Sequence, residues 1–189
     1  MQRYIEEIFG DNAGVIIVMD VRDGSILAAG SFPEYDLNPF VTGLSQAKWD
    51  ELVKSIDHPF TNKLVNGLYP PGSVIKMGVA MAFLDTGKMN RSDGYFCSGS
   101  FELGGRNFRC WNVYGHGFMD MNSAIRESCD DYFYKGSLKV GIDAITPVLE
   151  RLGFGQKSGV DLPNEFVGIV PGREWKMQNT LSRGIRARR

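Results

Sequence analysis

Ser73 and Lys76 stand three positions apart, directly after the segment Tyr-Pro-Pro-Gly at 69–72 and at the head of an apolar run. On an α-helix, positions i and i+3 share a face, so the Lys76 amine can reach the Ser73 oxygen if a helix begins at or just before Ser73. A serine hydroxyl becomes a nucleophile when a neighbouring base takes its proton, and a partly desolvated lysine can act as that base. The pair predicts acyl transfer through Ser73.

The surroundings of this pair favour it over a second Ser-x-x-Lys copy at Ser45 and Lys48, which lies in a polar segment. The two prolines before Ser73 hold the chain extended up to a turn, and the glycine that follows them lets the backbone bend tightly. The run 74–84 is apolar on nearly every helical face and ends near Gly87, a candidate C-cap. Such a helix is expected to be buried, so a lysine in its first turn needs a polar partner.

The second group of reactive side chains contains every cysteine of the chain and one of its two histidines. These residues follow one another at spacings of 13, 6 and 13 positions: Cys97, Cys110, His116 and Cys129. Zn²⁺ favours closed tetrahedral sites of three thiolates and one imidazole, although these spacings are not those of a zinc finger. A disulfide between Cys97 and Cys110, with Cys129 simply buried, is the alternative in an oxidising compartment. The residue types alone leave both open.

Composition limits the function classes. The chain has 189 residues, enough for one ordinary domain, and a formal net charge of -1, which excludes binding of nucleic acid by bulk charge. No apolar run approaches the ~18 residues of a membrane span, and the start of the chain is polar, so we expect neither a signal segment nor an anchor.

Local patterns predict a mixed α and β (α+β) domain that positions these groups. A β-hairpin is expected from strands at 15–20 and 25–29, followed by a loop region over 31–68 with one short helix around 45–55. Beyond the Ser73 helix, a glycine-rich irregular segment at 93–117 precedes a helix that opens near Asn122. A further helix is expected over 143–152, closed by Gly153, and then a loop over 154–175.

Several segments occur in the order typical of one family. They comprise Val18-Met19-Asp20, the stretch 23–28, 69–76, Gly115-His116-Gly117, 128–134, Gly141-Ile142-Asp143 and 171–176. From about Gly14 to Trp175 the chain therefore resembles the transpeptidase domain of class B penicillin-binding proteins, most closely the subgroup of the rod-elongation machinery. The resemblance implies part of a serine β-lactamase-like fold, with a helical subdomain and the N-terminal hairpin of a central antiparallel sheet.

The resemblance also implies roles for four residues. Ser73 matches the acylated serine of the Ser-x-x-Lys motif, and Lys76 matches its lysine, the proton acceptor during acylation. Ser128 matches the serine of the second motif, Ser-x-Asn, which passes a proton toward the leaving amine. Asp130 stands where most relatives carry asparagine and would contact substrate, although a carboxylate there only accepts hydrogen bonds.

The same subgroup is known to place zinc beside the active site, where Cys97, Cys110, His116 and Cys129 fall in this sequence. This resemblance favours zinc over the disulfide. A metal with four protein ligands is structural, with no open position for a reactive water. Because Cys129 lies inside the second motif, its bond to zinc would fix the backbone of Ser128 relative to Ser73.

The implied reaction is attack of Ser73 on the penultimate D-alanine carbonyl of a peptidoglycan stem peptide, followed by transfer of the acyl group to an amine of a neighbouring stem. β-Lactam antibiotics would acylate the same serine, and backbone N–H groups, that of Ser73 included, would hold the oxyanion. The expected partners are stem peptides, β-lactams and cell-wall proteins of the elongation complex, at the periplasmic face of the bacterial inner membrane.

The third motif of the family, Lys-Thr/Ser-Gly on a strand, has no acceptable match. The candidate at 157–159 lies in a segment that is a surface loop in relatives and follows Asp130 too closely. We therefore expect residues 1–180 to form a partial transpeptidase domain, and the arginine-rich residues 181–189 to be a disordered tail foreign to the family. The alternative function is a catalytically inactive, zinc-stapled fragment that at most binds partners. A β-lactamase or β-lactam sensor fits the motif surroundings less well.

Overall fold

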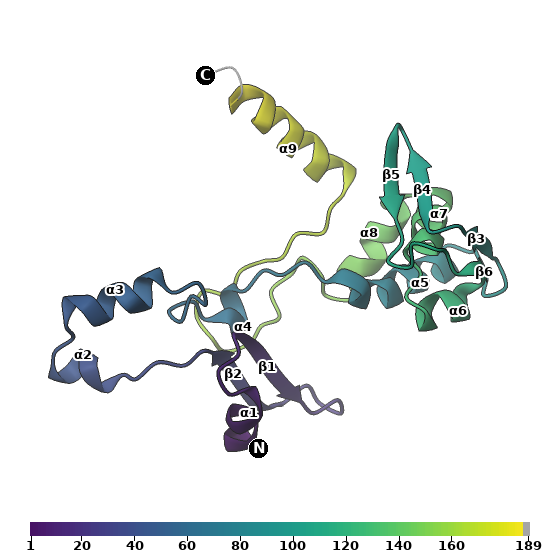
Figure 1. The fold of residues 1–189 in the computed structure, drawn as a ribbon. Helices are drawn as coiled ribbons and strands as arrows, with labels where there is room; N and C mark the ends of the chain where they lie inside the picture. The colour runs from purple at the N-terminus through teal and green to yellow at the C-terminus, as the bar shows by residue number, and fades with distance from the viewer. Residues whose placement is uncertain (187–189) are drawn as a thin grey trace. The chain divides into compact units, whose positions relative to one another are not determined.

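The computed structural model describes residues 1–186, which divide into two compact units. The first unit comprises Met1–Tyr69 and Gly159–Phe166, and the second comprises Pro70–Ser158 and the chain from Val167 onward. All the candidate site residues belong to the second unit. Each unit has its own helices and antiparallel strands (Figure 1), which confirms the expected mixed α and β fold class.

The first unit is built on the predicted hairpin. Strands β1 (Gly14–Met19) and β2 (Ile26–Phe32) pair antiparallel, and the helices of this unit are α1 (Gln2–Phe9), α2 (Asn38–Thr42), α3 (Gln46–Lys54) and α4 (Lys63–Asn66). Helix α3 confirms the helix predicted around 45–55, and it explains the second Ser-x-x-Lys copy. The Ser45 hydroxyl caps the helix by accepting a hydrogen bond from the Lys48 N–H, while Lys48 Nζ pairs with Glu51. That copy therefore serves local structure.

Helices provide most of the second unit. A short 3₁₀ turn, η1 (Gly72–Val74), leads into α5, and the α-helices are α5 (Ile75–Asp85), α6 (Met121–Arg126), α7 (Asp130–Val140), α8 (Ile142–Arg151) and α9 (Arg173–Arg186). Helix α5 packs against α7 and α8. Phe83 of α5 and Tyr132 of α7 are fully buried in the core between these helices, and Gly136 of α7 leaves the space that the Phe83 ring occupies.

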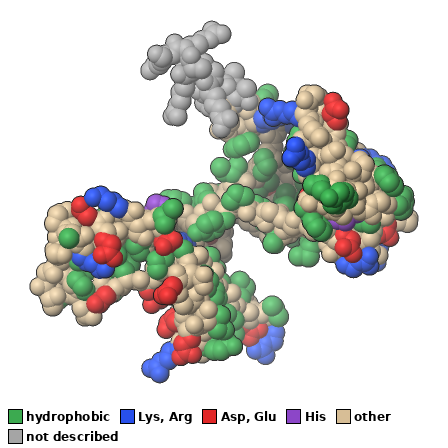
Figure 2. Space-filling view, viewed as in Figure 1, with side chains coloured by type: hydrophobic (Ala, Val, Ile, Leu, Met, Phe, Trp, Pro, Cys, Tyr) green, Lys and Arg blue, Asp and Glu red, His purple; other side chains and the backbone are tan. Residues whose placement is uncertain are grey.

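The apolar composition of α5 predicted that this helix is buried on every side, but the structure leaves part of it exposed. Lys76 and Phe83 are buried, but Val74, Met77 and Met81 are 71%, 60% and 50% exposed, so one face of the helix is open to solvent. Figure 2 shows other hydrophobic side chains reaching the visible surface as well. The expectation was wrong because a run without polar residues cannot indicate which of its faces meets the neighbouring helices.

The glycine-rich segment at 93–117 forms strands where the sequence predicted an irregular stretch. Strands β3 (Tyr95–Cys97) and β6 (Gly117–Met119) form one antiparallel pair, and β4 (Ser100–Leu103) and β5 (Arg106–Arg109) form a hairpin. The hairpin turn uses Gly104 and Gly105 at φ +59° and +74°, values that favour glycine. Both pairings matter for the site, because they return Cys110 and His116 to the end of β3 where Cys97 lies.

The remaining predictions concern the end of the chain. The candidate third motif at 157–159 lies in no strand, consistent with its rejection. Helix α9 reaches Arg186, and so extends into the segment 181–189 for which a disordered tail was predicted, while residues 187–189 lie outside the described residues. The boundary proposed at residue 180 stays a prediction. Within the described part of the chain, none of the helices combines the length and apolar character needed to cross a bilayer.

Candidate active site and cysteine cluster

Ser73 lies in the 3₁₀ turn that starts the central helix of the second unit. Gly72 adopts φ +56°, which permits the sharp bend after the two prolines and leaves the Ser73 side chain exposed. Ser128 Oγ donates a hydrogen bond to Ser73 Oγ at 2.9 Å. The predicted nucleophile is therefore accessible to a substrate and in direct contact with the serine of the second motif.

Lys76 is buried beside these two hydroxyls, with a relative exposure of 9%. Its Nζ donates to the Ser128 carbonyl at 2.8 Å, to Ser128 Oγ at 3.0 Å and to Asp130 Oδ1 at 2.6 Å. These three acceptors match the three N–H groups of a protonated amine. The polar partner that the sequence required for this lysine is thus supplied by the connection between α6 and α7.

The hydroxyl of Ser128 lies between the amine and the nucleophile. The sequence predicted that Lys76 could reach Ser73 directly, but the described residues include no hydrogen bond between the two, because the lysine directs its donors toward the connection after α6. The resulting order is Ser73 Oγ, Ser128 Oγ and Lys76 Nζ, with separations of 2.9 and 3.0 Å. We call these three residues and Asp130 the hydroxyl–amine relay.

Ser128 takes an uncommon backbone conformation to occupy this position. Its φ of +51° is in the left-handed region, which costs a non-glycine residue on the order of 1 kcal/mol or more. The bend ends α6 and lets α7 begin at Asp130, with Cys129 as the N-cap residue. It also allows the carbonyl and the hydroxyl of one residue to accept from the same amine, which offsets the strain.

Both carboxylate oxygens of Asp130 accept hydrogen bonds from inside the protein. Oδ1 receives the Lys76 amine, and Oδ2 receives the backbone N–H of Trp111 at 3.0 Å. The sequence predicted a substrate contact for this residue, which stays a prediction. The geometry gives Asp130 a different task, since it joins the catalytic lysine candidate to the segment that follows Cys110.

Trp111 is a further residue of the site, outside the catalytic and metal-ligating residues that the sequence predicted. Its indole Nε1–H donates to the carbonyl of Glu127 at 3.0 Å, in addition to the bond from its backbone to Asp130. The ring also meets His116 edge-on, with a centroid distance of 5.1 Å. A tryptophan next to a candidate ligand cysteine was the available signal, but its bonds across the fold could not be read from local sequence.

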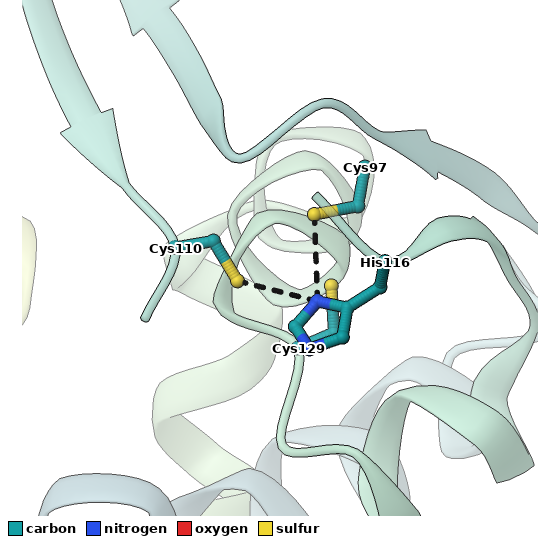
Figure 3. Close-up of side chains that lie close together, drawn as sticks. All are labelled: Cys97, Cys110, His116 and Cys129. Carbon is teal, nitrogen blue, oxygen red and sulfur yellow. Dashed lines mark hydrogen bonds between the residues drawn. The ribbon is translucent and has the colours of Figure 1, made fainter. Parts of the chain in front are cut away.

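The four candidate ligands converge on one point (Figure 3), as the sequence predicted. Cys97 ends β3, Cys110 follows β5, His116 precedes β6 and Cys129 precedes α7. Their ligand atoms all lie within 4.8 Å of one another, and the three cysteines are buried. His116 Nδ1 is 3.6 Å from Cys97 Sγ and 3.5 Å from Cys110 Sγ. We call this set the cysteine–histidine cluster.

The environment of the thiols differs from one cysteine to the next. Burial raises the pKa of Cys129 to about 12, and the neighbouring Cys97 and Cys110 act in the same direction. Burial also acts to raise the pKa of Cys110, but backbone N–H groups, foremost that of Asp131, outweigh it and hold that pKa below its ordinary value. Three thiolates packed this closely would repel one another unless a cation lay between them.

The arrangement fits a tetrahedral metal site. Zn–S bonds of about 2.3 Å and a Zn–N bond of about 2.0 Å place sulfur and nitrogen roughly 3.5 Å apart. The observed separations of 3.6 and 3.5 Å agree with that figure. All three cysteines are free thiols, so the disulfide alternative is absent from this structure. The cluster could hold a metal ion through three sulfur atoms and one imidazole nitrogen.

The sequence and the fold both match known proteins. The profile of the penicillin binding protein transpeptidase domain covers residues 14–186. The peptidoglycan D,D-transpeptidase MrdA of Salmonella typhimurium is 38% identical over 94% of this chain, and MrdA of Acinetobacter baumannii is 42% identical over 92%. This chain spans only 29% and 26% of the lengths of these two relatives.

Solved structures give the same result for the fold. Penicillin-binding protein 2 (PBP2) of Helicobacter pylori superposes on 93% of this chain with a TM-score of 0.85 and 46% identity, and the match spans 34% of that protein. PBP2 of Pseudomonas aeruginosa, solved in complex with WCK 5153, superposes on 94% of this chain with a TM-score of 0.84 and 40% identity, spanning 39% of that protein. A further structure shows the Helicobacter pylori protein in complex with MreC.

Proposed function

The chain belongs to the penicillin-binding protein transpeptidase family, and from that premise we propose that it carries the serine acylation centre of a peptidoglycan D,D-transpeptidase. The observation that carries this proposal is the hydroxyl–amine relay, in which an exposed serine is joined to a buried lysine through a second hydroxyl at 2.9 and 3.0 Å. Relatives with the name peptidoglycan D,D-transpeptidase support the same reaction class.

In the proposed reaction, Ser73 Oγ attacks the carbonyl carbon of the penultimate D-alanine in a stem peptide. The C–N bond to the terminal D-alanine breaks, the acyl group stays on Ser73 as an ester, and D-alanine leaves as an amine. An amine of a second stem then attacks the ester and releases Ser73. A β-lactam would enter by the same first step, with its ring C–N bond in place of the peptide bond.

The relay supplies the proton transfers that these steps need. In the resting arrangement Lys76 donates to Ser128 and Ser128 donates to Ser73. Acylation reverses both bonds: the two hydroxyl hydrogens turn, the proton of Ser73 passes to Ser128 Oγ, and the proton of Ser128 passes to Lys76 Nζ across the same two short separations. As all three N–H groups of Lys76 are donated in the resting arrangement, the amine must first release a proton, and Asp130 Oδ1 at 2.6 Å is the nearest acceptor. Ser128 then gives a proton to the leaving amine and takes one back from Lys76.

We further infer that the cysteine–histidine cluster binds Zn²⁺ through Cys97, Cys110, His116 and Cys129. Its support is the donor set, the burial of the three cysteines, and the two sulfur–nitrogen separations of 3.6 and 3.5 Å, which match those of a tetrahedral zinc site. When bound, zinc would act as a structural cross-link between β3, the segment after β5 and the N-terminus of α7. Cys129 lies between Ser128 and Asp130, so this cross-link would fix the position of the relay.

The proposed partners follow from the reaction and from the relatives. Stem peptides and β-lactams would meet Ser73, and proteins of the elongation complex would bind the complete protein, as the complex of a related PBP2 with MreC suggests. Because peptidoglycan lies outside the inner membrane, we place the activity at its periplasmic face. The alternative of an inactive, zinc-stapled fragment is not favoured, because Ser73, Ser128 and Lys76 are assembled within hydrogen-bond distance.

Intact-mass spectrometry after incubation with a fluorescent penicillin tests the proposal. The zinc-loaded chain should gain the mass of one penicillin, and the Ser73→Ala variant should gain none. Circular dichroism of both proteins confirms that they are folded. Absence of an adduct in folded, zinc-loaded wild-type protein contradicts the proposed acylation centre.

A further inference from the structure

Trp111 combines a fixed position with a large exposed surface beside the hydroxyl–amine relay. Trp111 is 63% exposed, although its backbone N–H and its indole N–H both donate hydrogen bonds within the protein. The backbone N–H donates to Asp130 Oδ2, and the indole N–H donates to the carbonyl of Glu127, each at 3.0 Å. Glu127 directly precedes Ser128, and Asp130 is the last residue of the second motif.

Both hydrogen-bonding groups of Trp111 are therefore used inside the protein. What remains available is the apolar indole surface, held in one orientation by the bond to Glu127 and by the edge-on contact with His116. A rigid aromatic surface loses little conformational entropy when it meets a ligand, and indole offers more apolar area than any other side chain. An aromatic ring of this kind suits the recognition of an apolar group.

We propose that the exposed indole of Trp111 contacts an apolar group attached next to the reacting carbonyl, and so determines which substrates and β-lactams acylate Ser73 efficiently. The proposal rests on the proposed function, because it places this contact beside the same nucleophile. Ser73 is reached from Trp111 through Asp130, Lys76 and Ser128 by consecutive hydrogen bonds of 3.0, 2.6, 3.0 and 2.9 Å. Trp111 is a specificity residue in this scheme.

The same loop offers a matched control. Tyr114 is 95% exposed and lies three positions after Trp111, and its backbone N–H bonds to Asn112 within the loop. No described hydrogen bond joins Tyr114 to the relay. Its replacement removes a comparable aromatic surface from the same loop without touching Asp130 or Glu127. An effect common to both positions would therefore reflect the loop as a whole.

Acylation kinetics with two penicillins test the contact. Benzylpenicillin carries an apolar phenylacetyl group next to the lactam carbonyl, whereas 6-aminopenicillanic acid carries only an amine. Trp111→Ala should lower the second-order acylation constant for benzylpenicillin about tenfold and change that for 6-aminopenicillanic acid less than about twofold. A tenfold change corresponds to about 1.4 kcal/mol, within the range of an aromatic contact. Trp111→Phe should keep most of the preference, and Tyr114→Ala all of it.

Equal losses for both penicillins in Trp111→Ala would overturn the proposal, because they would indicate that the side chain only positions Glu127; the backbone N–H that binds Asp130 is retained in alanine. Loss of the preference in Trp111→Phe to the level of Trp111→Ala would do the same. If Trp111→Phe retains the preference for benzylpenicillin, the preference comes from the aromatic surface and not from the indole N–H, which phenylalanine lacks.

A binding measurement covers the case in which the chain is not acylated at all. The chain contains three tryptophans, and ¹⁹F NMR of 5-fluorotryptophan-labelled Ser73→Ala protein resolves them without acylation. The Trp111 signal is identified by its loss in Ser73→Ala/Trp111→Phe. Benzylpenicillin should shift this signal and 6-aminopenicillanic acid should not. No shift with benzylpenicillin overturns the inference, while a shift without acylation of wild type defeats only the proposed function.

Discussion

The hydroxyl–amine relay and the cysteine–histidine cluster share one short connection, yet they are built in opposite ways. The relay keeps Ser73, the proposed nucleophile, exposed and joins its members at 2.6–3.0 Å, the range of ordinary and charge-assisted hydrogen bonds. The three cysteines of the cluster are buried, and the sulfur atoms of Cys97 and Cys110 are 3.6 and 3.5 Å from His116 Nδ1. The short oxygen–oxygen and oxygen–nitrogen distances of the relay suit proton transfer, whereas the longer sulfur–nitrogen distances of the cluster suit a metal ion bound between the ligands.

This difference assigns separate tasks to neighbouring residues. Ser128 and Asp130 face the lysine, while Cys129, between them, faces the cluster. Successive residues can point to opposite sides here because Ser128 is in the left-handed region and α7 begins at Asp130. Residues of the hydroxyl–amine relay and of the cysteine–histidine cluster thus alternate along the sequence. A substitution in the relay should therefore be distinguishable in its effects from a substitution in the cluster.

The largest expected effect is that of Lys76→Met on acylation. Methionine fills a similar volume but can neither accept nor donate a proton, so the acylation rate with a fluorescent penicillin should fall about 10³-fold. The cluster should be unaffected, and zinc content measured by mass spectrometry should equal that of wild type. A rate within tenfold of wild type would contradict the proposed role of the lysine.

A second variant separates lost chemistry from lost stability in this experiment. Lys76→Met leaves the Asp130 carboxylate without its cation in a partly buried position, which destabilises the folded state. Lys76→Met/Asp130→Asn removes that unpaired charge. The melting temperature of the double variant should return toward that of wild type, while its acylation rate should stay as low as that of Lys76→Met.

Zinc removal should affect the other region first. At free zinc about 1,000-fold above its dissociation constant, binding stabilises the fold by about 4 kcal/mol, which corresponds to a melting temperature roughly 10 °C higher for a chain of this size. A chelator should lower the melting temperature by that amount and make the three cysteines reactive toward a thiol reagent. Zn²⁺ should reverse both changes, and Mg²⁺, which prefers oxygen ligands, should not. Unchanged thiol reactivity after chelation would argue against the metal site.

Asp130→Asn probes the residue that touches both regions, with a smaller expected effect. A carboxylate can accept from Lys76 and from the Trp111 N–H at once, whereas an amide has one oxygen and must turn its NH₂ group toward one of these donors. Acylation should fall about tenfold, and Asp130→Ala should lose more. If asparagine supports the wild-type rate, the carboxylate is not required to hold the lysine.

Much of the fold could be predicted where the signal was local. The hairpin of β1 and β2 follows from β-branched runs around a turn, and α8 follows from an apolar pattern closed by Gly153. The separate helix α7 was missed, because the break at Ser128 depends on a left-handed residue that is not glycine. The strands β3 to β6 were missed since they are short and contain few β-branched residues.

The sequence could predict which residues form the site, but not the hydrogen bonds that join them. Ser73 and Lys76 came from their spacing and surroundings, Ser128 from motif resemblance, and the four cluster residues from their types. The structure brings each set together. The intermediate position of Ser128, the two bonds of Asp130 and the anchoring of Trp111 join residues that are 16 to 55 positions apart. Contacts at that separation depend on how helices pack, which no local pattern encodes.

The smallest expected effect concerns Asp120, which supports both regions from a distance. It caps α6, the helix whose end carries Ser128 and Cys129, in a reciprocal pair of bonds with Ser123. The hydrogen bonds from the Ser123 side chain and backbone lower the pKa of Asp120. A group with a lowered folded pKa stabilises the fold above its unfolded pKa of about 3.9, and this contribution is lost as the pH falls through the folded value.

Asp120→Ala should therefore melt a few degrees below wild type at pH 7, and the difference should shrink as the pH falls below about 4. Asp120→Asn keeps a capping oxygen without a titrating group, so its difference from Asp120→Ala should not depend on pH. Melting curves of the three proteins between pH 7 and pH 3 provide the test. If the difference in melting temperature between wild type and Asp120→Ala stays constant over this pH range, the charge of Asp120 does not contribute to the cap of α6.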